Sequence, residues 1–359
     1  MQNIKDCAVR PTKKSIIRSF LSSNSKHLII TGSRKSGKTT LLKDKIKEFK
    51  AEGIITKAIP KDKVTLCSSM DNEEIIIGRF NKDLPGTTNK MKADPVGFNS
   101  AVNKIDELVK SESEYIYIDE IGYLEKDNPD YLNKIDELLN AKKCLLVLRK
   151  ENLEHLNRIL NRNDVFTVDL DEPFKDVACV IMASGISQRF GDLKLLAEYK
   201  GKKLIEHILD KTEIFSKRVV VTRHQKIKDI CEERKIDCIL HDLPYKSDTI
   251  ALGTKHFYDN SEAIIFIPSD QPELSIDTLL SFMISAKNND SIIRLKYEDQ
   301  ISSPGLFPKK YYDELLNLPT DKGGNVLAKK YGSSYVLTDD IKETIDTDTR
   351  EELLKLEQM

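Results

Sequence analysis

Eight residues near the start of the chain, Gly32 to Thr39, read G-S-R-K-S-G-K-T and fit the pattern G-x-x-x-x-G-K-[ST]. In this pattern the glycines let the backbone aim several N–H groups at one anion, the lysine adds a charge at the β- and γ-phosphates, and the final hydroxyl can bind Mg²⁺. A strand-like segment (27–31) precedes the loop and a helix-like segment (40–49) follows it. The sequence therefore predicts a site for a nucleoside triphosphate, ATP or GTP, made by Gly32, Ser36, Gly37, Lys38, Thr39 and Thr40.

The segment Y-I-Y-I-D-E at 115–120 has the composition of a buried strand that ends in two carboxylates. In P-loop enzymes an acidic residue at such a strand end holds the Mg²⁺ of the nucleotide. We assign Thr39 and Asp119 to the metal, and Glu120 to the orientation of an attacking water. Arg149, which follows a later strand-like segment, is either a γ-phosphate contact or a surface arginine.

A second loop with phosphate-binding chemistry spans 183–194 and reads A-S-G-I-S-Q-R-F-G-D-L-K. Its glycines permit close approach of the backbone to a phosphate or a base, its serine and neighbouring amides can donate to phosphate oxygens, and it carries two cations. Such a loop suits a triphosphate whose pyrophosphate must leave. The predicted nucleotide-binding residues are Ala183, Gly185, Ser187 and Gly191, and the predicted catalytic cations are Arg189 and Lys194.

An aspartate, Asp270, ends the apolar run of F-I-P-S-D-Q-P at 266–272. An aspartate at the carboxyl end of a central strand, opposite a phosphate loop, is a natural Mg²⁺ ligand in an open α/β sheet. The competing role is a cap for the helix that begins near Ser275, but Ser275 is itself the better N-cap. We therefore predict that Asp270 binds metal and takes part in catalysis.

These residues need a scaffold, and strand-like and helix-like segments alternate along the whole chain, as in α/β proteins. The alternation stops at the acidic segment 169–176 and restarts with a new apolar strand, so each phosphate loop follows the first strand of its own series. We predict two α/β domains, 1–172 and 173–359. The predicted strands are 27–31, 115–119, 143–148, 165–170, 177–182, 218–222, 237–241, 263–268 and 291–297.

The composition excludes some classes of partner. Of 359 residues, 57 are basic and 58 acidic, which gives a net charge of −1 and no basic field for a nucleic acid. No apolar run approaches the roughly 20 residues of a membrane span, and the first residues lack the apolar core of a secretory signal. We expect a cytoplasmic protein with neither a nucleic-acid nor a membrane partner.

Apolar residues at 16–21 have the period of a short amphipathic helix, which we expect to pack on the first domain. None of the six cysteines forms a C-x-x-C pair, and Cys144 and Cys179 lie in or beside strand-like runs. Reduced, structural cysteines are therefore expected. The six histidines lack metal-binding spacing, so no transition-metal site is predicted.

The first 172 residues resemble the small nucleoside-triphosphatase family that hydrolyses NTPs with low specificity. The resemblance rests on the loop at 32–39 and on D-E-I-G at 119–122, followed by L-E at 124–125. The family usually has a basic residue where Tyr123 stands here, a difference that bears on turnover more than on nucleotide binding. The resemblance implies a P-loop NTPase fold and NTP hydrolysis.

The loop at 183–194 resembles the L-A-A-G-x-S-x-R-M-G-x-x-K signature of MobA/MocA-type nucleotidyltransferases, with Ser184 for the usual alanine and Phe190 for the usual methionine. The triplet D-Q-P at 270–272 is similar to the family's G-D-Q-P metal motif, with Ser269 for glycine. The resemblance implies a Rossmann-like α/β fold of the nucleotide-diphospho-sugar-transferase type.

Three further segments extend this resemblance over nearly all of 177–340. S-D-T-I-A-L-G (247–253) resembles a family loop of small hydroxyl residues before a glycine. S-P-G-L-F-P (303–308) and D-K-G-G (321–324) look like the two late motifs of the MocA branch. These late motifs make the resemblance closer to molybdenum-cofactor cytidylyltransferases than to guanylyltransferases.

The implied reaction joins CTP to a molybdopterin-type cofactor and gives a cytosine dinucleotide cofactor and pyrophosphate. The resemblance implies that Arg189 and Lys194 neutralise the pyrophosphate and that Asp270 holds Mg²⁺. Thr249 and Asp321 would contact the pterin or lie in a second shell around the metal. An apo molybdenum hydroxylase is the implied recipient of the product.

Two alternatives remain at this stage. The C-terminal half could charge a sugar phosphate or a polyol phosphate, because such enzymes share the first loop. It could instead carry a finished cofactor to an apo-hydroxylase without catalysis, with the P-loop half as a switch. Pyrophosphate release separates a transferase from a carrier.

Overall fold

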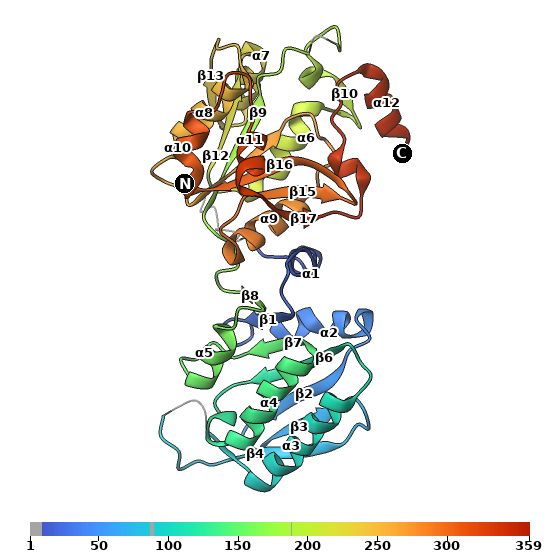
Figure 1. Cartoon of the computed structure of the whole chain (residues 1–359), viewed down its shortest axis with the longest axis vertical. Helices are drawn as coiled ribbons and strands as arrows, with labels where there is room; N and C mark the ends of the chain where they lie inside the picture. The colour runs from blue at the N-terminus through green and yellow to red at the C-terminus, as the bar shows by residue number, and fades with distance from the viewer. Residues whose placement is uncertain (1–8, 87–89, 188) are drawn as a thin grey trace. The chain divides into compact units, whose positions relative to one another are not determined.

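The computed structural model describes residues 9–86, 90–187 and 189–359. Two compact α/β units make up the chain (Figure 1). We call Asn24–Glu172 the P-loop unit, and the C-terminal unit combines Pro173–Met359 with the described residues before Asn24. Within the described ranges, no helix has the length and apolar character needed to cross a membrane.

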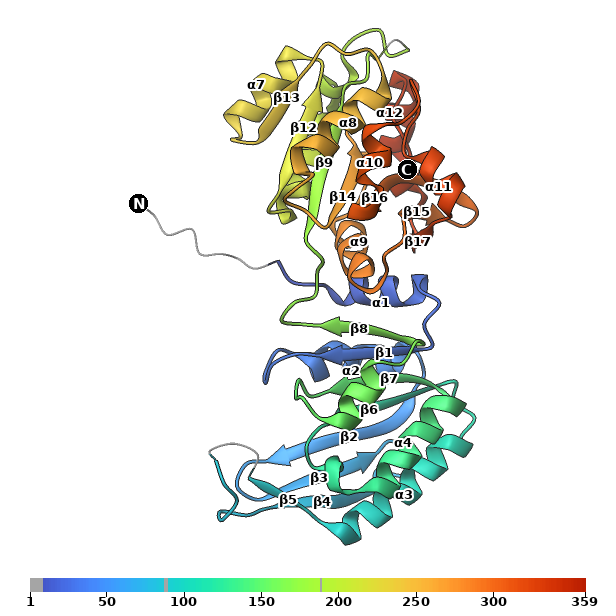
Figure 2. The ribbon, with the colours of Figure 1, turned by 60° about the vertical axis from the view of Figure 1, so that its left-hand side comes forward.

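The P-loop unit is built on an eight-stranded mixed sheet in the order β5-β4-β3-β2-β6-β7-β1-β8 (Figure 2). Strands β2, β6, β7, β1 and β8 are parallel, and β3, β4 and β5 extend the sheet antiparallel. The bounds are β1 His27–Thr31, α2 Lys38–Glu48, β2 Glu52–Ile59, β3 Lys63–Ser68, β4 Glu74–Phe80, β5 Met91–Ala93, α3 Pro95–Lys110, β6 Tyr115–Ile121, η1 Glu125–Asp127, α4 Pro129–Ala141, β7 Lys143–Leu148, α5 Glu154–Leu160 and β8 Val165–Asp169.

Strand β1 lies between β7 and β8, and all five of its residues are buried. This explains its continuous apolar sequence, because a strand covered on both faces has no solvent side to alternate with. The paired helices α3 and α4 cover the sheet, with an edge-to-face contact between Phe98 and Tyr131 at a ring distance of 5.3 Å. The strands predicted at 27–31 and 143–148 have these bounds in the structure.

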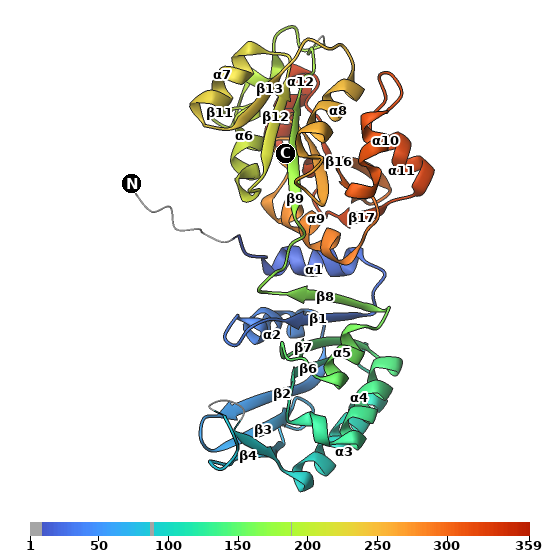
Figure 3. The same cartoon turned by 90° about the vertical axis from the view of Figure 1, so that its left-hand side faces the viewer.

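The C-terminal unit is built on a seven-stranded sheet in the order β13-β12-β9-β14-β16-β15-β17 (Figure 3). Strands β13, β12, β9 and β14 are parallel, and β16 runs antiparallel to β14 and β15. The bounds are α1 Lys13–Ser22, β9 Val177–Ala183, η2 Lys194–Leu196, β10 Glu198–Tyr199, β11 Lys202–Lys203, α6 Leu204–Lys211, η3 Thr212–Ile214, β12 Arg218–Thr222, α7 Gln225–Glu233, β13 Asp237–Leu240, α8 Lys246–Phe257, β14 Ala263–Pro268, α9 Ile276–Asn288, β15 Ile293–Tyr297, β16 Gln300–Pro308, η4 Lys309–Tyr311, α10 Tyr312–Leu316, α11 Asn325–Tyr331, β17 Ser334–Leu337, η5 Ile341–Thr344 and α12 Arg350–Gln358.

Successive side chains of β9 enter two different cores. Cys179 and Ile181 pack on one face of the sheet, while Ala178 and Val180 pack on the other. Helix α8 covers the second face, and a Cβ at Gly253 would lie 2.5 Å from a methyl of Val180. The segment 247–253, expected to be a loop, is therefore helical, and its glycine allows the helix to lie close to β9.

The N-terminal helix is a second correction to the sequence-based picture. The helix expected at 16–21 exists as α1, but it packs on α9 and β17 of the C-terminal unit rather than on the first domain. Ile16, Ile17 and Phe20 are buried in this contact, whereas Leu21 is exposed. The amphipathic period predicted a helix with one buried face, but it held no information about which surface covers that face.

The cysteines of the described ranges, which exclude Cys7, are free thiols. Cys144 in β7 and Cys179 in β9 have no exposed surface. Burial raises the pKa of the Cys144 thiol to about 12, so this group behaves as a small apolar side chain. The expectation of structural cysteines in buried strands is confirmed for these two residues.

Candidate functional site

The phosphate-binding loop of the P-loop unit connects the carboxyl end of β1 to the start of α2. Gly32 and Gly37 have φ angles of +143° and +97°, which other residues rarely adopt. A Cβ at Gly32 would also lie 3.2 Å from Leu170 Cβ. Backbone conformation and close packing therefore both explain the glycine at the start of the loop.

Lys38 is buried, and its ammonium group donates to the carbonyls of Gly32 and Ser33, each at 2.9 Å. On the same loop, the backbone N–H and the hydroxyl of Ser33 both donate to Asp171 at 2.9 Å. These bonds hold together the residues that a triphosphate would contact.

The predicted metal pair of the P-loop unit is formed in space. Thr39 Oγ1 donates to Asp119 Oδ1 at 3.0 Å, which joins the first turn of α2 to the end of β6. The Ser36 hydroxyl is buried and has no hydrogen-bond partner within the described residues. Thr40 is exposed on α2 and does not line the cavity described below.

Glu120 accepts a hydrogen bond from Arg149 Nε at 2.8 Å, and both residues line a cavity of about 230 Å³ together with Gly32 and Lys38. The Arg149 guanidinium also lies over the ring of Tyr123, 5.1 Å from its centroid. Arg149 thus places a cation next to Tyr123, the position at which the nucleoside-triphosphatase family usually has a basic residue. Of its two expected roles, the cavity position favours the phosphate contact.

A larger cavity of about 380 Å³ lies in the C-terminal unit, at the carboxyl ends of β9, β12 and β14. Strand β12 lies on one side of β9 and β14 on the other. In an open α/β sheet, the point where the strand order changes direction is the usual place for a ligand. The predicted residues that line it are Gly185, Lys194, Thr249, Asp270 and Asp321. The predicted residues Ala183, Ser187, Arg189 and Gly191 belong to the same loop but do not line this cavity.

Three cationic residues line this cavity, Lys194, Arg223 and Lys246, and Lys194 is the buried one. Its Nζ lies 2.5 Å from Asp270 Oδ2 and 2.8 Å from Asp348 Oδ1. Burial acts to lower the pKa of Lys194, but the charges and hydrogen bonds of the two carboxylates outweigh it, and the pKa rises above its ordinary value. Lys194 is therefore charged at neutral pH.

The loop from 183 to 194 is shaped by its own side chains. Ser187 has a φ of +52°, and its hydroxyl accepts from the backbone N–H of Lys194 at 3.3 Å. Ser184, which stands where the family has alanine, donates to Val221 O at 3.1 Å and bonds the His241 ring at 2.9 Å. Gly191 turns the chain with a φ of +81°.

Arg189 does not line the cavity, although it was expected to neutralise the pyrophosphate there. Its side chain is 71% exposed and pairs with Asp348 outside the cavity wall. Because Asp348 also binds Lys194, the two cations share one carboxylate. The pKa of Asp348 lies below its usual value, and the largest cause is the hydrogen bond that Lys194 donates to it.

Two carboxylates of the site, Asp346 and Asp348, were not predicted; they lie in the segment I-D-T-D-T at 345–349. Asp346 lines the cavity, where desolvation and then the charge of Asp270 raise its pKa to about 6. The signal was present: two aspartates two residues apart lie directly before a helix with a Thr349 capping box. These aspartates were not predicted because they lie far from the other motifs in the sequence, although their chemistry suits the site.

The two late motifs are neighbours in the structure. S-P-G-L-F-P forms the end of β16, and D-K-G-G leads into α11. A Cβ at Gly324 would lie 2.3 Å from the ring of Phe307, so the two motifs pack tightly. Ser303 and Asp321 from these motifs both reach the cavity wall. Both late motifs therefore contribute to the wall of the cavity.

Ser275 is the N-cap of α9, and its hydroxyl accepts from the Thr278 N–H at 3.1 Å, as expected from the sequence. Asp270 is therefore not needed as a cap. No group of three or more His, Cys, Asp or Glu side chains suited to a metal ion occurs among the residues that the structure describes.

Two protein-family models match this chain. Residues 27–181 match the NTPase model, and residues 179–334 match the model of the MobA-like NTP transferase domain.

Among curated proteins, the chain is similar to two described as "Probable molybdenum cofactor guanylyltransferase". One, from Bacillus cereus (strain Q1), is 31% identical over 120 residues, which cover 32% of this chain and 60% of the relative. Another, from a second Bacillus cereus strain, is 35% identical over 101 residues, which cover 27% and 50%. The chain thus spans between 50% and 60% of the length of these relatives.

Among solved structures, one that the chain is similar to is that of molybdopterin-guanine dinucleotide biosynthesis protein A from Archaeoglobus fulgidus. It has 19% sequence identity and a TM-score of 0.42, and the match covers 50% of this chain and 97% of that chain.

Proposed function

We propose that the C-terminal unit transfers a nucleotide to a molybdopterin-type cofactor, because residues 179–334 match the model of the MobA-like NTP transferase domain and residues 27–181 match the NTPase model. The observation that carries this proposal is the cavity lined by the paired Lys194 and Asp270, where Lys194 also bonds Asp348 outside the wall. Its cation, its carboxylates and the adjacent phosphate loop are the groups that nucleotidyl transfer needs.

In the proposed reaction, an oxygen of the pterin's terminal phosphate attacks the α-phosphorus of the nucleoside triphosphate. The bond from the α-phosphorus to the bridging oxygen breaks, and pyrophosphate leaves with the electron pair. The attacking phosphate is already ionised at neutral pH, so no general base is needed. The chain's task is to orient the two substrates and to neutralise charge.

Lys194 is the main neutralising group because it is buried, charged and at the cavity wall. Arg189 lies at the exposed end of the same loop and shares Asp348 with Lys194, so it assists from outside the cavity. Thr249 and Asp321 line the other parts of the wall and contact the pterin in this proposal.

The carboxylates at the cavity fit a bound Mg²⁺. Burial and, after it, the charge of Asp270 raise the pKa of Asp346, so a cation placed between these two carboxylates would offset their repulsion. Oxygen ligands of this kind suit Mg²⁺, which usually keeps water and phosphate oxygens in addition to one or two carboxylates. When bound there, Mg²⁺ would neutralise charge on the α-phosphate.

The base of the nucleotide is part of this proposal. The late motifs at 303–308 and 321–324 favour CTP, and the product would then be a cytosine dinucleotide cofactor for an apo molybdenum hydroxylase. The names of the curated relatives refer to a guanylyltransferase. CTP and GTP are therefore compared directly in the experiment below.

For the P-loop unit we propose NTP hydrolysis. Lys38 and the loop amides hold the phosphates, Thr39 and Asp119 hold Mg²⁺, and Glu120 orients the attacking water. The support is geometric, because the Thr39–Asp119 hydrogen bond and the Glu120–Arg149 ion pair border one phosphate loop.

The experiment measures pyrophosphate release by the purified full chain with Mg²⁺ and molybdopterin, separately with CTP, GTP, ATP and UTP. Lys38→Ala serves to remove hydrolysis by the P-loop unit, and Asp270→Ala to remove the transferase. We expect pterin-dependent release with CTP that survives Lys38→Ala and is lost in Asp270→Ala.

Other results have defined meanings. Release with GTP alone would keep the transferase and reject the cytosine proposal. Release with a sugar phosphate, but not with molybdopterin, would show a different acceptor. A chain that binds molybdopterin and never releases pyrophosphate would be a carrier, and the proposed function would be wrong.

A further inference from the structure

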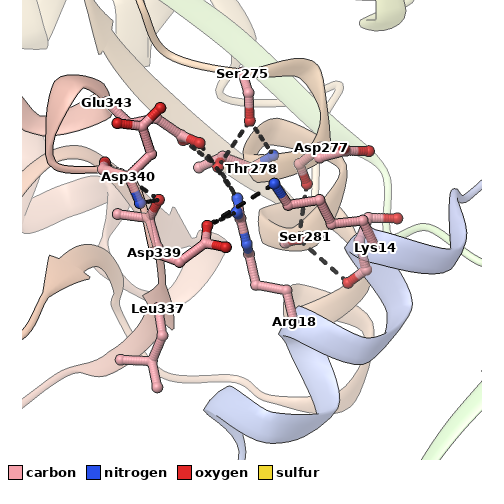
Figure 4. A network of polar contacts seen from close by, with 12 residues as sticks. Lys14, Arg18, Ser275, Asp277, Thr278, Ser281, Leu337, Asp339, Asp340 and Glu343 are labelled. Carbon is pink, nitrogen blue, oxygen red and sulfur yellow. Dashed lines mark hydrogen bonds and ion pairs between the residues drawn. The ribbon is translucent and has the colours of Figure 1, made fainter. Parts of the chain in front are cut away.

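The N-terminal helix α1 is an integral part of the C-terminal unit (Figure 4). Ser19 Oγ donates to Ser281 O at 3.1 Å, and Ser281 Oγ donates to Ser15 O at 3.2 Å, which joins α1 to α9. The N–H of Leu337 in β17 donates to Ser22 Oγ at 2.9 Å. Hydrogen bonds to two elements, α9 and β17, therefore hold α1 in one place.

Arg18 extends from α1 into the polar network shown in Figure 4. Its side chain is only 6% exposed. The guanidinium donates to Thr278 Oγ1 and, at 3.0 Å, to Asp339 Oδ1, and it lies 3.5 Å from Glu343 Oε1. Arg18 thus contacts α9, the loop after β17, and η5 at once.

Glu343 is the buried partner of this network, with a side chain 3% exposed. Its other oxygen accepts from the Thr278 hydroxyl. A carboxylate at such depth needs a counter-charge and hydrogen bonds, since a buried unpaired charge is strongly unfavourable. The place of η5, which carries Glu343, therefore depends on the guanidinium that α1 supplies.

The chain runs directly from η5 into the candidate active site. Glu343 lies three residues before Asp346 in the sequence and five before Asp348. Between these carboxylates, the N–H and the hydroxyl of Thr347 both donate to Asp270 O at 3.1 Å. The backbone of 345–348 is thus tied at one end to Asp270 and at the other to η5.

A second connection reinforces the first. The carbonyl of Thr344, the last residue of η5, accepts from Ser302 Oγ at 3.3 Å. Ser302 Oγ in turn accepts from Gln271 Nε2 at 3.3 Å, and Gln271 follows Asp270 in the chain. A shift of η5 would therefore move Asp346 and Asp348 relative to Asp270 and Lys194.

We infer that Arg18 is a positioning residue for the transferase site, holding η5 through Glu343 so that Asp346 and Asp348 stand opposite Asp270 and Lys194. The inference rests on the proposed function for its catalytic consequence. It means that the active site of the C-terminal unit is completed by a residue that precedes the whole P-loop unit in the sequence.

The test compares full-chain variants in a Lys38→Ala/Asp119→Ala background, which removes the proposed phosphate and metal ligands of the P-loop unit. Arg18→Met keeps the length of the stem but removes the charge. Thr12→Ala is a stringent control: it removes both the N-cap of α1 and the bond from Thr12 Oγ1 to Asp277 Oδ1 of α9 at 2.5 Å, without touching Glu343. Lys14→Ala removes an exposed ion pair to Asp339.

Two quantities are measured: kcat for pterin-dependent pyrophosphate release, and the affinity for Mn²⁺ by electron paramagnetic resonance with the α,β-methylene analogues of CTP and GTP. We expect Arg18→Met to lower both by about 10- to 100-fold, as is usual when the group that orients a metal ligand is lost. For Thr12→Ala and Lys14→Ala we expect kcat and Mn²⁺ affinity to stay within about twofold of the parent values, well short of the loss expected for Arg18→Met.

The double variant Arg18→Met/Glu343→Gln distinguishes a positioning role of Arg18 from a purely structural one, because it removes the buried charge that Arg18→Met leaves unpaired. We expect it to regain the thermal midpoint of the parent without regaining Mn²⁺ affinity. Recovery of both together would overturn the inference, as would an Arg18→Met chain with unchanged kcat and Mn²⁺ affinity.

If Arg18→Met does not fold, Arg18→Lys replaces it, and hydrogen exchange of 341–349 is measured instead. Faster exchange there, but not in α9, supports the inference, and unchanged exchange contradicts it. A parent chain that releases no pyrophosphate, while Arg18→Met still loses Mn²⁺ affinity, would reject the proposed function and leave the positioning role standing.

Discussion

Lys194 Nζ lies 2.5 Å from Asp270 Oδ2, although 76 residues separate the two in the sequence. Lys194 ends the loop that follows β9, and Asp270 follows β14, the parallel neighbour of β9. Because the carboxyl ends of neighbouring parallel strands meet at one edge of the sheet, the cation and the carboxylate meet at the cavity.

Lys194→Ala should lower the rate of pterin-dependent pyrophosphate release by about 100-fold, because a preorganised cation at developing charge is lost. Single-turnover measurements isolate this step. The control is Lys217→Ala, which removes a lysine paired with Asp176 at 2.6 Å and away from the cavity. A rate of Lys194→Ala equal to that of Lys217→Ala would exclude a catalytic role for this ammonium group.

Glu120→Gln should lower kcat for NTP hydrolysis by about 100-fold or more and leave NTP binding nearly unchanged, because the carboxylate acts on water rather than on the phosphates. Binding is followed with a fluorescent NTP analogue and hydrolysis by phosphate release. Glu114→Gln is the control, because Glu114 precedes the opposite end of β6 and pairs with Lys143 at 2.6 Å. Loss of binding in Glu120→Gln would argue for a phosphate-site role instead.

Gly324→Ala should destabilise the C-terminal unit by about 1–3 kcal/mol, because its Cβ would lie 2.3 Å from the buried Phe307 ring. The adjacent Gly323→Ala is the control, because its Cβ would meet Lys246 at an ordinary 3.4 Å. Denaturant unfolding of both variants gives the difference. Equal stabilities would mean that the late motifs do not pack as tightly as described.

His27 predicts a pH dependence of the P-loop unit. Its ring is fully buried, Nδ1 accepts from the Cys144 N–H at 3.2 Å, and Nε2 lies 3.3 Å from Asp164 Oδ2. Burial lowers the pKa of His27 from 6.5 to about 4, although Asp164 acts in the opposite direction. Protonation of the ring would also remove the acceptor that Cys144 uses.

The unfolded chain therefore binds more protons than the folded chain between pH 6.5 and 4. The contribution of His27 is complete above pH 6.5 and should decrease by on the order of 3 kcal/mol as the pH falls to about 4. His27→Gln, which keeps an acceptor and cannot titrate in this range, should abolish this part of the pH dependence. Denaturant unfolding of both chains at several pH values gives the difference, and identical curves would contradict the assignment.

Several features could be predicted from consecutive residues. The loops at 32–39 and 183–194, the strands that precede them and the N-cap at Ser275 depend on local backbone chemistry, which short patterns encode directly. The α/β class of both units follows from the alternation of buried strands and helices. Asp270 could be placed at a strand end because its strand is continuous and apolar.

The tertiary structure decided which of these segments meet in space. The sequence holds Asp348 and Lys194 in segments 154 residues apart, and only the folded sheet brings them within 2.8 Å. The segment 247–253 was expected to be a loop, yet it lies in α8, where Gly253 lets the helix pack closely on Val180. Helix α1 shows the same limit, since its period reveals a buried face, whereas Arg18 meets Glu343 only because the long-range packing of apolar surface brings α1 against α9 and β17.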